Sequence, residues 1–255
     1  MERIDIGGIS VEALVAGGGP PLVFLHGIDY WAQHQVFLDQ LAQRYRLIAP
    51  RHPGFGNSPR PAWMRSVGDL AYLYLDLFDR LALEDATLVG ASFGGWLALE
   101  IAVRSTAHLG RLVLIDSLGL KFGARDEAEI TDLWALGAEE LVRHNFADPA
   151  NAPDYGALDD AAVEEVARDR EASVLYGWRP YMHNPSLTHW LHRVTVPTLL
   201  LWGAEDRVVV PAYGERLAAA IPGARLQTIA GAGHYPAVEQ PAAICAAIAN
   251  FAPGA

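Results

Sequence analysis

The pentapeptide Gly90-Ala91-Ser92-Phe93-Gly94 places a serine between glycines, directly after the apolar run 86–89. A helical pattern follows over residues 92–104, so the sequence predicts a sharp strand-to-helix turn at Ser92. The glycines allow neighbouring chains to approach closely, and the helix start adds partial positive charge. A serine here can also be a simple helix N-cap. Strand, turn and helix together favour Ser92 as a nucleophile.

A serine hydroxyl needs a positioned base near neutral pH. Of the nine histidines, His234 has the best context, because it lies in the glycine-flanked loop 231–236 between the last predicted strand and the last predicted helix. Loops at the carboxyl edge of such sheets gather functional residues. His183, His189 and His192 form a looser group with no carboxylate nearby, so we expect no metal site and no cofactor.

The base in turn needs a carboxylate that fixes its tautomer. Asp206 follows the apolar run 198–201, and Glu205 is its immediate neighbour. Asp116 ends the run 112–115 and is a second candidate, although it could instead organise the segment that follows. Either aspartate satisfies the chain order serine, acid, histidine. We favour Asp206.

An attacked carbonyl also needs donors for its developing negative charge. The loop that begins at His26-Gly27 follows the apolar run 22–25 and would supply the backbone N–H of Ile28. The second donor would be the N–H of Phe93, the residue after the serine. Such donors are commonly worth about 3 kcal/mol each in the transition state. His26 itself is expected to brace this loop rather than to act as a base.

The candidate catalytic residues can meet only in a fold that brings the ends of several strands together. Short, continuously apolar runs alternate with longer amphipathic ones, which is typical of a mostly parallel sheet covered by helices on both faces. A further strand is expected to start within residues 1–10. The predicted strands are 22–25, 46–49, 86–89, 112–115, 198–201 and 225–229, and the predicted helices are 33–43, 66–83, 92–104, 213–220 and 239–251.

One segment, residues 117–193, breaks this alternation with charged helical stretches and bulky aromatic residues. The sequence therefore predicts a helical insertion that covers a core built from residues 1–116 and 194–255. Trp134, Trp178 and Tyr181 of the insertion, together with His26, are candidates to line a substrate pocket. Aromatic residues in an insertion serve packing equally often.

The overall composition limits the class of partner. The chain has 255 residues, 51% of them apolar, and a formal net charge of -11. This acidity argues against nucleic acid or an anionic membrane as the main partner. The partner that we expect is a small-molecule ester substrate. Cys245 is the single cysteine, so no disulfide forms within the chain. With no signal-peptide pattern at the start, we expect a cytoplasmic protein. The oligomeric state is not readable from the sequence.

Taken together, the chain resembles the α/β-hydrolase superfamily. The resemblance rests on His26-Gly27, residues 53–58, the pentapeptide 90–94, residues 202–206 and Gly233-His234. It implies an α/β-hydrolase fold with an eight-stranded, mostly parallel sheet and a helical lid after the sixth strand. Sister enzymes that act on epoxides or haloalkanes resemble each other in having aspartate at the nucleophile position, so serine argues against those two chemistries.

The chain departs from the family pattern at Arg51, where an aspartate is common. Arg51 and His52 could contact an acidic substrate group, but a surface ion pair is the favoured interpretation. The predicted function is hydrolysis of carboxylic esters through an acyl-enzyme. One alternative is hydrolysis of a carbon–carbon bond in a dienoate, with Arg179 as the candidate partner of the carboxylate. An alternative of another class is a non-catalytic member of the fold that only binds its ligand.

Overall fold

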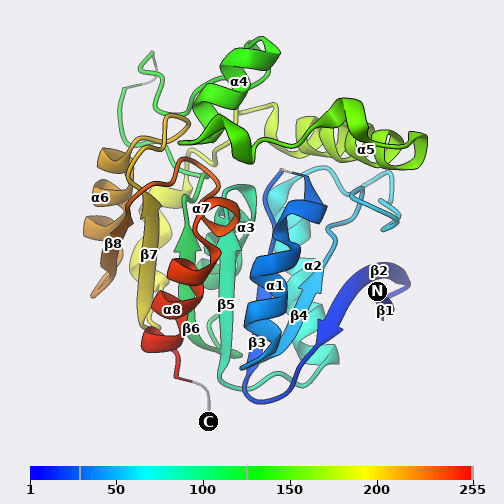
Figure 1. Cartoon of the computed structure of the whole chain (residues 1–255). Helices are drawn as coiled ribbons and strands as arrows, with labels where there is room; N and C mark the ends of the chain where they lie inside the picture. Colours follow the sequence, from blue (N-terminus) through cyan, green and yellow to red (C-terminus); the bar gives the residue numbers. More distant parts are fainter. Residues whose placement is uncertain (29, 125, 254–255) are drawn as a thin grey trace.

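The strands form one twisted sheet in the order β1-β2-β4-β3-β5-β6-β7-β8 (Figure 1). The first pairings, β1 with β2 and β2 with β4, are antiparallel, and all later pairings are parallel. The computed structural model describes residues 1–253 except 29 and 125. The strands are β1 (Glu2–Ile6), β2 (Ile9–Ala16), β3 (Pro21–Leu25), β4 (Arg46–Pro50), β5 (Ala86–Ala91), β6 (Leu109–Ile115), β7 (Thr198–Gly203) and β8 (Arg225–Ile229).

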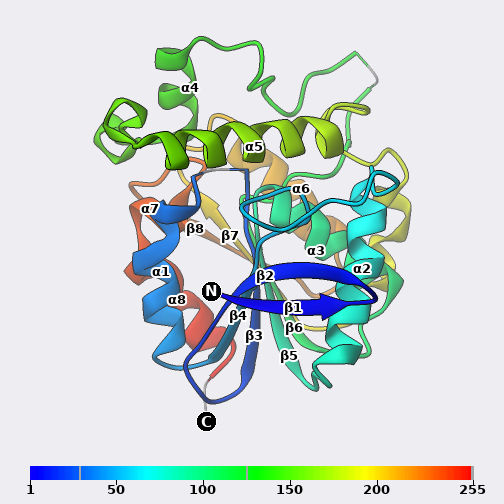
Figure 2. The same cartoon turned by 90° about the vertical axis from the view of Figure 1, so that its right-hand side faces the viewer.

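Helices cover both faces of this sheet (Figure 2). On one face lie α1 (Gln35–Ala42) and α8 (Pro241–Phe251), which contact each other. On the other lie α2 (Val67–Arg80), α3 (Phe93–Arg104) and α6 (Pro211–Ala220). All six residues of β5 and of β7 are buried, which explains why their sequences are apolar apart from Thr87 and Thr198. The predicted mostly parallel eight-stranded sheet with flanking helices is confirmed.

The segment between β6 and β7 forms a layer above the carboxyl ends of the parallel strands (Figures 1 and 2). It contains α4 (Ala138–Asn145), η2 (Pro149–Asn151), η3 (Tyr155–Ala157), α5 (Asp160–Gly177) and η4 (Leu187–Arg193). Asp159 caps α5 by accepting a hydrogen bond from the N–H of Ala162. Within the part of the chain that the structure describes, no helix is long and apolar enough to cross a membrane.

The structure agrees with the predicted core strands to within a few residues and differs at three other places. The first residues form a hairpin of β1 and β2 rather than one short strand. The predicted helix 33–43 begins with the 3-10 turn η1 (Trp31–His34) before α1. The predicted helix 239–251 corresponds to α8, which begins two residues later at Pro241, and the short helix α7 (Pro236–Glu239) precedes it. Pro241 cannot continue a helix from the preceding turn but suits the first position of a new one.

Candidate functional site

Ser92 lies at the turn between β5 and α3. Its backbone has φ 51° and ψ -115°, a conformation that L-residues rarely adopt. Its N–H donates to the carbonyl oxygen of Ile115 on β6 at 2.8 Å, which ties the turn to the neighbouring strand end. Backbone strain of this kind persists only where the surroundings enforce it and clusters at functional sites. The predicted strand-to-helix turn at Ser92 is therefore present.

The two glycines of the pentapeptide allow this turn to pack against its surroundings. A Cβ on Gly94 would lie 2.0 Å from the carbonyl oxygen of Leu25 at the end of β3. A Cβ on Gly90 would lie 2.3 Å from the carbonyl oxygen of Gly94. Neither distance is compatible with a side chain, so the start of α3 packs directly against the loop that follows β3.

His234 occupies the loop between β8 and α7 and faces the serine. Its Nε2 lies 2.8 Å from Ser92 Oγ, and its Nδ1 lies 2.9 Å from Asp206 Oδ2. Its backbone N–H donates at 2.8 Å to the carbonyl oxygen of Asn145, the last residue of α4. The overlying segment between β6 and β7 thus helps to hold the histidine loop.

Asp206 is fixed on its other side. Its Oδ1 accepts hydrogen bonds from the N–H groups of Val208 and Val209 at 2.8 and 3.0 Å. Asp206, Ser92 and His234 are each at most 2% exposed. Backbone donors to a buried carboxylate stabilise its charged form, and the carboxylate leaves its second oxygen for the imidazole. The structure thus brings together the three residues that the sequence analysis favoured.

The two rival carboxylates lie differently. Glu205 is exposed and ion-paired with Arg207 at 3.9 Å. Asp116 is fully buried, and its Oδ1 accepts a hydrogen bond from the N–H of Gly203 at 2.9 Å. One oxygen of Asp116, one oxygen of Asp206 and one ring nitrogen of His234 lie within 4.8 Å of one another. Asp206 therefore contacts the imidazole, and Asp116 lies beside the pair.

The two predicted backbone donors belong to the segments that follow β3 and β5. Phe93 is the first residue of α3, so its N–H has no carbonyl acceptor within the helix. Ile28 lines a cavity of about 240 Å³ between the core and the overlying segment. This cavity is also lined by Tyr30, Gln33, Leu133, Trp134, Leu141, Asn145, Phe146, Pro153, Tyr155, Arg170, Glu171, Ser173, Val174 and Tyr235.

The pocket candidates from the sequence are distributed over several cavities. Trp134 lines the cavity that contains Ile28. Trp178 and Arg179 line a neighbouring cavity of about 580 Å³, and Tyr181 lines a third. The rings of Trp134 and Trp178 nevertheless pack against each other at 5.6 Å between centroids.

Sequence reasoning missed the polar lining of the Ile28 cavity. Asn145 is 7% exposed, and its Oδ1 has no hydrogen-bond partner among the described residues. Arg170 and Ser173 also line the cavity, from α5. Nothing in the local sequence marks these positions. Tyr235 was signalled only by its place next to His234.

His26 and His52 form a buried stacked pair beneath the Ile28 loop. Their ring centroids are 4.0 Å apart. His26 Nδ1 lies 2.7 Å from the carbonyl oxygen of Gly27, and its Nε2 accepts the N–H of His52 at 3.2 Å. Burial, the neighbouring ring of His52 and Arg51 lower the pKa of His26 well below its ordinary value. Burial lowers the pKa of His52 to about 3. Both rings are therefore neutral and brace the loop.

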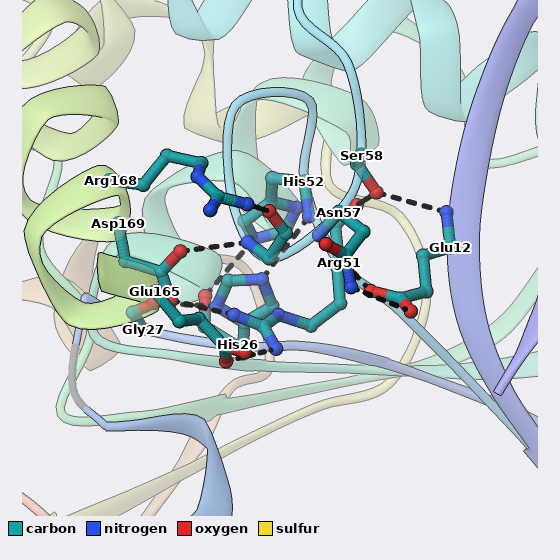
Figure 3. Close-up of polar contacts among 11 residues, drawn as sticks. Glu12, His26, Gly27, Arg51, His52, Asn57, Ser58, Glu165, Arg168 and Asp169 are labelled. Atoms are coloured by element: carbon teal, nitrogen blue, oxygen red, sulfur yellow. Dashed lines mark hydrogen bonds and ion pairs between the residues drawn. The ribbon is translucent and has the colours of Figure 1, made fainter. Parts of the chain in front are cut away.

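The expectation of a surface ion pair at Arg51 is wrong, because the residue is only 2% exposed. Figure 3 shows its contacts with α5. Its Nη2 lies 2.6 Å from Asp169 Oδ2 and its Nη1 lies 2.9 Å from Glu165 Oε1, both on α5. The guanidinium also lies 4.8 Å from the ring centroid of Trp31. Arg51 thus joins the core to α5, and the carboxylates of Asp169 and Glu165 neutralise its charge.

Comparison with known proteins agrees with this architecture. The chain is 29% identical to the 2-hydroxymuconate semialdehyde hydrolase of Pseudomonas sp. strain CF600, over 98% of this chain and 92% of that protein. It is 30% identical to the 2-hydroxy-6-oxo-2,4-heptadienoate hydrolase of Pseudomonas putida strain F1, over 92% and 89%. A thermophilic esterase from Thermogutta terrifontis superposes with a TM-score of 0.80 at 23% identity, over 98% of each chain. The profile described as "Alpha/beta hydrolase family" matches residues 22–247. This chain therefore belongs to the alpha/beta hydrolase family, and it has the fold that the sequence resemblance implied.

Proposed function

We propose that the chain is a serine hydrolase that cleaves carboxylic esters through an acyl-enzyme intermediate. The observation that carries this proposal is the 2.8 Å contact between Ser92 Oγ and His234 Nε2, made at a serine with φ 51°. A hydroxyl in this position can transfer its proton to the imidazole while its oxygen attacks a carbonyl carbon.

In the first step Ser92 Oγ bonds to the ester carbonyl carbon, and His234 accepts the hydroxyl proton. The N–H groups of Ile28 and Phe93 stabilise the negative oxygen that forms. Asp206 holds the imidazole in the tautomer that presents Nε2 to the serine, through its 2.9 Å contact with Nδ1. His234 then gives the proton to the departing alcohol.

In the second step a water molecule attacks the acyl group on Ser92. His234 accepts a proton from this water and returns a proton to Ser92 Oγ as the acid leaves. Ser92 and His234 are each about 1% exposed, and Tyr235, the residue after His234, lines the Ile28 cavity. We take the Ile28 cavity as the acyl site, and its volume of about 240 Å³ suits a small acyl or aryl group.

A second candidate function is hydrolysis of a carbon–carbon bond. Two relatives of this chain are named as hydrolases of 2-hydroxymuconate semialdehyde and of 2-hydroxy-6-oxo-2,4-heptadienoate. Neither substrate name contains an ester, which favours the carbon–carbon alternative over ester cleavage for those two relatives. Arg170 lines the Ile28 cavity and is the cation best situated for a substrate carboxylate, whereas Arg179 lines the neighbouring cavity.

The first experiment compares the wild-type protein with Ser92→Ala. A fluorophosphonate probe should label the wild-type chain and leave the variant unlabelled, because labelling requires an activated serine. Turnover of a nitrophenyl ester should fall by a factor on the order of 10⁴ or more in the variant. A matched far-ultraviolet spectrum and melting temperature would show that the fold is retained. Absence of labelling in the wild type would instead support a binding role.

The second experiment sets a panel of small esters against a vinylogous 1,5-diketone with a terminal carboxylate. The ester proposal predicts a higher kcat/KM for at least one ester. A preference for the diketone that disappears in Arg170→Met would replace the ester proposal with carbon–carbon cleavage.

A further inference from the structure

The site contains a second buried carboxylate, Asp116, whose role the mechanism above leaves open. Asp116 follows β6 and has φ 42°, and its N–H donates to the carbonyl oxygen of Leu201 at 3.1 Å. Its side chain is fully buried. Oδ1 accepts the N–H of Gly203 at 2.9 Å, whereas Oδ2 has no donor among the described residues. A buried oxygen in this state needs a partner.

The group that Asp116 faces is another carboxylate. Oxygens of Asp116 and Asp206 lie within 4.8 Å of each other and of a ring nitrogen of His234. Two carboxylates are both acceptors, so a hydrogen bond between them requires a proton on one of them. Asp206 already accepts two backbone N–H groups and faces a ring nitrogen of His234, so its two oxygens already act as acceptors. Asp116 accepts only one N–H group, so the proton belongs on Asp116.

The charged groups around Asp116 also favour its protonated form. Burial raises the pKa of Asp116 well above its ordinary value, and the charge of Asp206 and the hydrogen bond to it raise it further. Glu239 adds a smaller effect of the same sign. Glu239 lies behind the histidine loop, where its Oε2 accepts the N–H of Gly233 at 2.6 Å. A ring nitrogen of His234 also lies within 4.8 Å of this pair of carboxylates, and it faces Asp206.

We propose that Asp116 is a positioning residue that stays a neutral acid and donates the proton on Oδ2 to the carboxylate of Asp206. This inference rests on the proposed function, in which Asp206 orients His234. When His234 takes the proton of Ser92, the new positive charge faces Asp206, and the proton of Asp116 stays where it is. Asp116 thus holds the side chain of Asp206 in place, and the negative charge of Asp206 stays beside the imidazole.

The first test measures protein stability and needs no activity. Urea unfolding of the wild type and of Asp116→Asn is followed between pH 5 and pH 8. The unfolded chain loses the proton of Asp116 near its ordinary pKa, whereas the folded chain keeps it, so the stability that this group contributes is lost as the pH rises. The unfolding constant of the wild type, relative to the variant, should therefore rise by about tenfold per pH unit.

The control for this test is Asp76→Asn, which makes the same chemical change at an exposed position of α2. Its unfolding constant relative to the wild type should stay constant with pH. A constant ratio for Asp116→Asn as well would overturn the inference, because Asp116 would then be ionised in the folded protein.

The second test uses the pH dependence of kcat/KM for an ester. Asn at position 116 can still accept from Gly203 and donate to Asp206, so the midpoint of the acidic limb should stay at its wild-type position. Asp116→Ala removes the donor, leaves the Asp206 charge free to stabilise a protonated imidazole, and should move this midpoint to higher pH. We expect kcat to fall by about tenfold in Asp116→Ala and by less than about threefold in Asp116→Asn.

The two tests separate the inference from the proposed function. If Asp116 were an anion, Asp116→Asn would remove a negative charge near His234 and move the acidic midpoint to lower pH, which would overturn the inference alone. If the wild type neither reacts with a fluorophosphonate nor hydrolyses any substrate, the proposed function fails. The unfolding experiment then still decides whether Asp116 carries a proton in the folded protein.

Discussion

Gly94 connects the serine turn to the loop that holds Ile28. A Cβ at this position would meet two backbone carbonyl oxygens, that of Leu25 at 2.0 Å and that of His26 at 2.6 Å. Backbone cannot move aside as a flexible side chain can, so any residue larger than glycine must separate α3 from the end of β3. This separation would displace the N–H groups of Phe93 and Ile28 relative to each other.

We therefore expect Gly94→Ala to lower kcat for the preferred substrate by about 100-fold or more, which is the typical effect of losing one oxyanion donor. Gly18→Ala is the control, because a Cβ there meets nothing within 4 Å. Steady-state kinetics on both variants, after melting curves have shown that they are folded, make the comparison. Equal kcat values would contradict the predicted close approach.

At the scale of elements, α5 is held to the core by contacts with the loop after β4 (Figure 3). Arg51 supplies the ion pairs to Asp169 and Glu165 described above. Asp169 Oδ1 also accepts the N–H of Gly56 at 2.7 Å, and Arg168 donates to the carbonyl oxygen of Gly56 at 2.6 Å. Because α5 also lines the Ile28 cavity, this anchor sets one wall of the proposed substrate site.

Removal of one partner from a buried ion pair leaves an unpaired buried charge. Arg51→Met should therefore lower the free energy of unfolding by about 3 to 5 kcal/mol and raise KM more than it lowers kcat. The double variant Arg51→Met with Asp169→Leu should recover part of this stability, because no carboxylate is then buried opposite an apolar side chain. Urea unfolding of both variants measures the difference.

Arg143→Met is the control for this prediction. Arg143 pairs with Glu139 at 3.8 Å on the surface of α4, and the arginine side chain is 60% exposed. Its loss should change stability by less than about 1 kcal/mol. If Arg51→Met were equally mild, the ion pairs with α5 would not anchor the helix.

At the scale of the whole molecule, the buried carboxyl group of Asp169 makes the free energy of unfolding depend on pH. Burial is the main cause that raises the pKa of Asp169 to about 6, and Arg51 opposes it only in part. The folded chain therefore holds this proton at pH values where the unfolded chain has lost it. The stability that Asp169 contributes is complete below about pH 4 and is lost as the pH rises through about 6.

Relative to Asp169→Asn, the wild type should accordingly lose up to about 3 kcal/mol of unfolding free energy between pH 4 and pH 7, and little more above pH 7. Urea unfolding at half-unit pH intervals on both proteins measures this difference. A difference that does not change over this range would mean that Asp169 titrates in the folded protein as it does in the unfolded chain.

The sequence by itself determined the parts of this protein that depend on local pattern. Largely apolar runs indicated the core strands, because a strand covered on both faces carries few polar residues. The glycines around Ser92 and His234, each at a strand end, indicated the turn and the loop that the structure brings within 2.8 Å of each other. The break in the alternation of strands and helices over residues 117–193 marked the helical segment that lies between β6 and β7.

Tertiary structure alone decided what depends on contacts between distant segments. Asp116 and Asp206 both follow strands, so the sequence leaves open which of them contacts His234. The packing of β6 beside β7 and the position of the histidine loop show that Asp206 contacts the imidazole. Arg51 looked like a surface residue because its partners Glu165 and Asp169 lie 114 and 118 positions away. The polar lining of the Ile28 cavity was hidden for the same reason. Local sequence encodes periodicity and turns, whereas burial and ionisation are set by whichever groups the folded chain brings together.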